Sequence, residues 1–152
     1  MLRDPQQDLT SEESWERANA NYLTTLAQSD INPVYFELYP VMIALIERLV
    51  SAGVNHHYYA FTSHERLCIR RYEHRRLVCA AAIVVNPREG NRVDCYFHRA
   101  KERPDSPATL HVPACDLDRA EMVILSMLGD LDQYRHEIPP DEFNIPEEWY
   151  LK

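Results

Sequence analysis

Apolar residues recur at helical spacing in two stretches of the N-terminal third. The first helix is predicted to begin at Thr10, because Thr10 and Glu13 have the spacing of a capping box, and to run to about Ser29. The second is predicted between the cap at Asn32-Pro33 and Gly53. The two apolar stripes are Trp15, Ala18, Tyr22 and Leu26, and then Tyr35, Leu38, Met42, Leu45, Ile46 and Leu49.

Beyond the second helix the apolar period changes to two, which predicts strands. Strict alternation covers residues 56–61, 66–71 and 93–98. The run from Leu77 to Val85 does not alternate, so both of its faces should be covered and we expect it in the middle of the sheet. Short connections favour an antiparallel meander of four strands, or of five if Thr109–Val112 also joins it.

A third helix is predicted from about Asp118, where Glu121 completes the cap. The fold class is therefore α+β, with two N-terminal helices, a four- to five-stranded antiparallel meander sheet, a C-terminal helix and an extended tail. Residues 1–9 are expected to be a flexible N-terminus, 10–136 a single domain, and 137–152 an extended acidic and aromatic segment packed on it. The helices should cover one face of the sheet. The other face could be covered by the third helix, by the C-terminal segment, by a second copy in a homodimer, or by another protein.

Composition narrows the class of protein. A length of 152 residues with 45% hydrophobic residues suits one domain, and three glycines are too few for a dinucleotide fingerprint or a phosphate-binding loop. No apolar stretch follows the first basic residue, Arg3, and the apolar run from Leu77 to Val85 is too short to span a membrane. These features predict a cytoplasmic protein with reduced cysteines and no membrane partner.

The net charge of −8 hides a segregation along the chain. Residues 1–53 hold 3 basic and 8 acidic side chains, residues 54–104 hold 10 and 5, and residues 105–152 hold 3 and 11. The basic middle is therefore expected to lie close enough to the acidic ends for their charges to neutralise one another.

Two cysteine–histidine pairs have the spacing of a small zinc site: Cys95 with His98, and His111 with Cys115. However, Cys95 and His98 are an odd number of residues apart in an alternating strand, so their side chains should leave on opposite faces. We therefore predict neither a bound metal nor a cofactor.

Cys68 is the best candidate for a catalytic thiol. It alternates with Arg66 and Arg70, whose charges would lower its pKa, and His56 or His57 could assist it. This pattern keeps a small Cys/His-dependent enzyme among the alternatives.

The basic middle of the chain also favours single-stranded nucleic acid as a ligand, because arginines that hold phosphates are interleaved with tyrosines that could stack bases. The flanking acidic segments would oppose such binding unless they lie on the far side. The residues concerned are Arg66, Arg70, Arg71, Arg75, Arg76, Arg88, Arg92 and Arg99, with Tyr58, Tyr72 and Tyr96.

The favoured prediction is a non-enzymatic acidic protein-binding module, inhibitor- or immunity-like, that recognises a basic partner protein. Its binding residues are expected in the C-terminal segment, where prolines hold aromatic anchors and carboxylates in an extended chain. These residues are Asp141, Glu142, Phe143, Glu147, Glu148, Trp149 and Tyr150.

Overall fold

A computed structural model describes residues 9–28, 30–71, 78–79, 81–99, 109–132 and 137–138. The predicted flexible N-terminus, apart from Leu9, and the C-terminal segment beyond Ile138 lie outside these residues. The elements, in chain order, are α1 (Ser11–Leu26), α2 (Tyr35–Ser51), the short 3-10 helix η2 (Val54–His56), β1 (Tyr59–Ser63), β2 (Arg66–Arg70), β3 (Val78–Cys79), β4 (Ala81–Arg88), β5 (Arg92–Arg99), β6 (Thr109–Cys115), α3 (Leu117–Leu131) and β7 (Glu137–Ile138).

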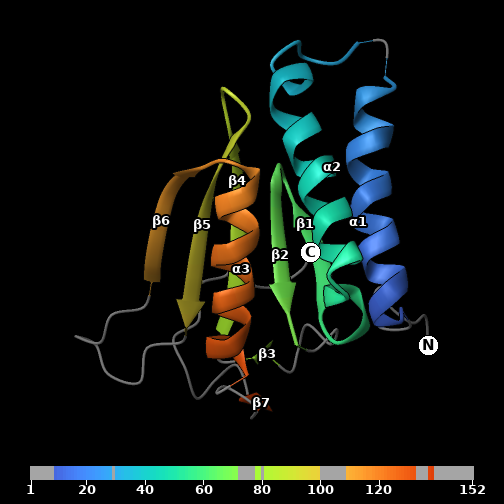
Figure 1. Ribbon diagram of the computed structural model, residues 1–152. Helices are drawn as coiled ribbons and strands as arrows, with labels where there is room; N and C mark the ends of the chain where they lie inside the picture. Colours follow the sequence, from blue (N-terminus) through green and yellow to red (C-terminus); the bar gives the residue numbers. More distant parts are fainter. Residues whose placement is uncertain are drawn as a thin grey trace.

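Five of the strands form one antiparallel sheet in the order β1-β2-β4-β5-β6 (Figure 1). The α+β fold, the antiparallel sheet with a fifth strand, and the helix order are confirmed. The central position of the apolar run is confirmed for β4, but the expectation of one strand from Leu77 to Val85 is wrong. Val78 and Cys79 form β3, which pairs with β7 and not with the large sheet.

The helices begin where local signals place them, within a few residues. In the capping box of α1, the Glu13 amide donates to Thr10 Oγ1 at 3.1 Å and the Thr10 amide donates to Glu13 Oε1 at 3.3 Å. The N-cap of α3 is Asp116, which accepts from the Arg119 amide, so the expected start at Asp118 is two residues late.

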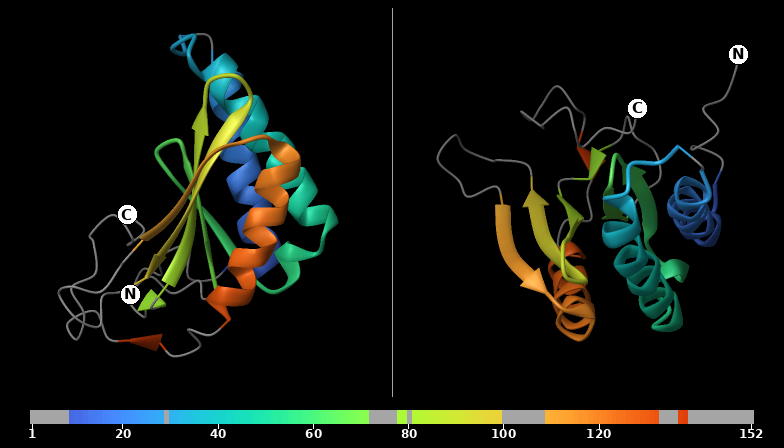
Figure 2. Two further views of the ribbon diagram at one scale, coloured as in Figure 1. Left: turned by 60° about the vertical axis from the view of Figure 1, so that its left-hand side comes forward. Right: turned by 90° about the horizontal axis from the view of Figure 1, so that it is seen from above.

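All three long helices lie on one face of the sheet (Figure 2). Between them and the sheet lies the main core, which includes Trp15, Tyr22, Met42, Leu45, Leu49, Leu67, Ile69, Ile83, Val85, Cys95, Ile124 and Leu131. The opposite face of β4 is buried too, because Ala82 and Val84 are only 3% and 6% exposed. The prediction that both faces of this strand are covered is therefore confirmed.

None of the helices in the described ranges is both long enough and apolar enough to cross a membrane.

Candidate protein-binding surface

The fold separates charge between its two layers. The helical layer, defined as residues 9–28, 30–51 and 116–132, carries 11 acidic and 3 basic side chains. The described parts of the five-stranded sheet, residues 59–71, 81–99 and 109–115, carry 3 acidic and 6 basic side chains. The molecule thus has a net charge of −8 on its helical layer and +3 on its sheet, so a basic partner would be attracted to the helical side.

A groove of about 630 Å³ runs between α2 and α3. Arg48 of α2 spans it, with its guanidinium hydrogen-bonded to Asp118 and 3.5 Å from Glu121. The hydrogen bond to Asp118 raises the pKa of Arg48 above its usual range. Glu47, Ser51 and Leu117 complete much of the lining. One arginine is therefore shared by two carboxylates, and the groove keeps an excess of negative charge.

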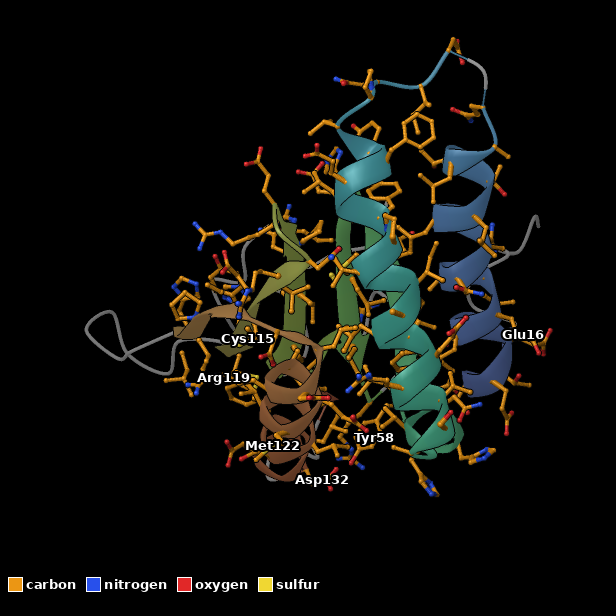
Figure 3. The ribbon with its side chains drawn as sticks, turned by 45° about the horizontal axis from the view of Figure 1, so that its top comes forward. Glu16, Tyr58, Cys115, Arg119, Met122 and Asp132 are labelled. Atoms are coloured by element: carbon orange, nitrogen blue, oxygen red, sulfur yellow. The ribbon has the colours of Figure 1, made fainter. Side chains whose placement is uncertain are left out.

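Apolar side chains also lie exposed on α3. Leu125 follows the groove residue Glu121 by one helical turn and is 42% exposed, and Met122 follows Asp118 by one turn and is 72% exposed. Figure 3 shows Met122 on α3 with Arg119 near it. Exposed apolar residues with charged neighbours are typical of protein interfaces, where an apolar anchor supplies affinity and the charged rim guides association.

The opposite face of the sheet has less of the character expected of a nucleic-acid surface. On its β1–β2 side Arg70 is 3% exposed and Phe61 is 4% exposed, with the guanidinium 4.6 Å from the ring centroid. Neither side chain is presented to a ligand, although the helices all lie on the other face. Arg75, Arg76 and Tyr72, which belonged to the predicted nucleic-acid surface, lie outside the described residues.

Two arginines of the basic middle segment contact carboxylates from the acidic C-terminal part. Arg71 Nε lies 3.8 Å from Asp132 Oδ1, and Arg92 Nη1 lies 3.9 Å from Asp116 Oδ2. The predicted neutralisation is confirmed for this pair of segments. At the C-terminal end of α3, the Tyr58 hydroxyl donates to Asp132 at 2.9 Å (Figure 3). Burial, together with this hydrogen bond, raises the pKa of Tyr58 to about 12.

The zinc-like spacing does not bring its four residues together. Cys95 and Cys115 are buried on the helix side, where burial and the neighbouring Cys115 raise the pKa of the Cys95 thiol. The rings of His98 and His111 stack on Tyr96, at centroid distances of 5.6 and 4.3 Å. Since Tyr96 alternates with Cys95, these rings lie on the opposite face, as the odd spacing predicted.

The expected activation of Cys68 is wrong. Burial raises the pKa of this thiol, and that effect outweighs the charges of Arg70 and Arg66. The register pairs Cys68 with Phe61 of β1, whereas His56 and His57 belong to the η2 turn that precedes this strand. His56 instead lies 3.1 Å from Glu12 Oε1. The structure therefore does not form the imagined thiol–imidazole pair.

Asp94 has a role that no sequence pattern indicated. This carboxylate is 7% exposed, accepts from the Ala114 amide at 2.8 Å, and lies 3.4 Å from Arg88 and 3.9 Å from His111. Ala114 has a φ of +53°, within the β-bulge of β6. Asp94 thus holds an unfavourable backbone conformation in place, which is a structural role.

The seven C-terminal residues predicted to bind a partner, from Asp141 to Tyr150, lie outside the described residues. The C-terminal segment 137–152 begins with β7, which pairs with β3, shortly before β4 in the chain.

The comparisons with known proteins add no relative: no family model matches the chain, and searches of curated proteins and of solved structures gave no match.

Proposed function

We propose that this protein is a non-enzymatic, inhibitor- or immunity-like binding module of the cytoplasm that recognises a basic partner protein through its helical layer. The observation that carries the proposal is the charge of −8 on one layer, together with the α2–α3 groove and the exposed Met122, which lies on α3 one turn beyond Asp118. Met122 would anchor the partner, while Glu47, Asp118 and Glu121 would face its basic side chains.

Sequence-derived expectations extend this surface into the C-terminal segment. Phe143, Trp149 and Tyr150 there combine with carboxylates in the same way as Met122 combines with the acidic residues of the groove. Their contribution to binding stays a prediction.

In the first step of the experiment, the protein is immobilised and a lysate of the source cell is passed over it at low salt. The proteins that it retains are then identified. The retained protein is then purified, and its Kd is measured at low and at physiological salt for the wild type and three variants. We expect Met122→Lys and Glu47→Lys each to weaken binding by about tenfold or more, because each adds a like charge at the interface.

Glu89→Lys is the matched control, since Glu89 is an exposed acidic residue on the β4–β5 hairpin and the charge change is the same as in Glu47→Lys. Glu89→Lys should change Kd less than twofold, because surface charges far from the interface are largely screened. A partner that is acidic, or a Kd equally insensitive to all three substitutions, would contradict the proposal.

A further inference from the structure

The two edges of the five-stranded sheet are treated differently. The β1 edge is covered by α1, whose side chains bond to the backbone there: Trp15 Nε1 donates to the Tyr58 carbonyl at 2.9 Å, and Ser14 Oγ accepts from the Ala60 amide at 3.0 Å. At the other edge, β6 pairs with β5 on one side and, within the described ranges, with no strand on the other (Figure 1).

The first half of β6 lacks the features that usually protect an exposed edge. Thr109 to Val112 contains no charged residue and no proline, whereas natural edge strands carry lysines, prolines or bulges that prevent pairing with another chain. Those features appear only in the second half, at Pro113 and at the bulge around Ala114. A partner strand can therefore pair with residues 109–112 and not beyond them.

The same half-strand presents an apolar side chain and a fixed conformation. Leu110 is 55% exposed, although it lies on the sheet face that the helices cover. His111 is held by its stack on Tyr96, with ring planes 6° apart. An ordered edge loses little conformational entropy when it pairs, which favours association.

We propose that residues Thr109–Val112 of β6 pair antiparallel with the same residues of a second copy, forming a homodimer through a continuous sheet. A second copy suits the site because the segment is self-complementary: it carries no formal charge that would repel its own copy, and its exposed Leu110 can be covered by an apolar residue of the same segment. A two-fold axis normal to the sheet through Leu110 places the Leu110 residues of the two copies opposite each other, whereas an axis through His111 would set Thr109 opposite Pro113.

In this dimer both helical layers lie on the same side of the joined sheets. The dimer would therefore present two acidic surfaces in one direction. The contact itself is short, so we expect a weak dimer that dissociates on dilution. It uses a different surface from the one proposed for the basic partner, and its test requires no partner.

The test measures the oligomeric state of the full chain by sedimentation equilibrium from micromolar to millimolar concentrations. Leu110→Lys should weaken the dimer by about tenfold or more, because two lysines would meet across the axis. Leu23→Lys is the control: Leu23 on α1 is 49% exposed, so the variant makes the same charge change at similar exposure but away from β6.

A second measurement uses mild oxidation with glutathione disulfide. Leu110→Cys should form a disulfide between two chains, and Leu23→Cys and the wild type should not. A chain that stays monomeric throughout the concentration range, a dimer equally strong in Leu110→Lys, or absence of the Leu110→Cys cross-link would each overturn the proposal.

Discussion

The β1 and β6 edges of one sheet show two ways in which a strand's outer backbone groups are handled. At β1, backbone groups that would otherwise be open bond to Trp15 and Ser14 of α1, and Tyr22 of the same helix donates from its hydroxyl to the Glu65 carbonyl in the β1–β2 turn at 3.0 Å. At β6 only the half near Pro113 is protected. The difference teaches that a sealed edge depends on specific buried side chains of the monomer, whereas an open edge can be altered with little effect on folding.

The comparison therefore makes opposite predictions for the two edges. Substitutions in α1 that remove a bond to β1 should lower the free energy of unfolding. Exposed substitutions in β6, such as Leu110→Lys, should leave it within about 0.5 kcal/mol while altering association.

The largest effect is expected for Trp15→Ala. Trp15 is 1% exposed, and its removal both empties a large volume and leaves the Tyr58 carbonyl without its donor. The free energy of unfolding should fall by about 3–5 kcal/mol, measured by urea unfolding followed by circular dichroism. Trp15→Phe keeps most of the volume but loses the N–H, so it should cost about 1–3 kcal/mol. Equal stability of Trp15→Ala and the wild type would show that α1 does not hold this edge.

A smaller but more specific effect is expected for Ser14→Ala. Ser14 is 1% exposed, accepts from the Ala60 amide and donates to the Ser11 carbonyl at 2.6 Å. The substitution leaves a buried amide without an acceptor, which should cost about 1–3 kcal/mol in the same measurement. Ser126→Ala, an exposed serine on α3, is the control and should stay within about 0.5 kcal/mol of the wild type.

Local sequence signals predicted much of the fold because their physical causes are local. The capping box at Thr10, the helical stripes and the central apolar strand all depend on neighbouring residues, and each was confirmed. The hydrogen bonds from α1 side chains to the β1 backbone could not be predicted, because the partners are far apart in the chain: Ser14 and Ala60 are separated by 46 residues. The same limit explains the error at Cys68: alternation predicted its arginine neighbours, but burial depends on what packs over the strand.

The candidate surface was predictable only in part. The acidic character of residues 1–53 and 105–152 is visible in the sequence, and the helices lie on one face of the sheet as expected, but the groove between α2 and α3 could not be foreseen because it depends on how the two helices pack. The exposure of Met122 could not be foreseen either, because Met122 lies at helical spacing with Leu125, Leu128 and Leu131, of which only the last two are buried. Helical periodicity alone does not show where an apolar stripe ends and an exposed apolar residue begins.

The smallest effect concerns the hydrogen bond between His56 and Glu12, which joins the turn before β1 to the start of α1. His56 Nδ1 lies 3.1 Å from Glu12 Oε1, and this hydrogen bond lowers the pKa of Glu12. A carboxylate with a lowered pKa in the folded state stabilises the fold above its unfolded pKa of about 4.3, and the contribution is lost as pH falls through the folded value. Glu12→Gln should therefore lower Tm slightly at neutral pH, and the difference from the wild type should vanish in acid.

Since both side chains are half-exposed, salt should reduce the effect as well. Glu16→Gln, an exposed site on the same helix, serves as the control for a general change in charge. If the wild type and Glu12→Gln differ equally in acid and at neutral pH, or if the difference survives in a His56→Ala background, this pair does not fasten α1 to the β1 edge.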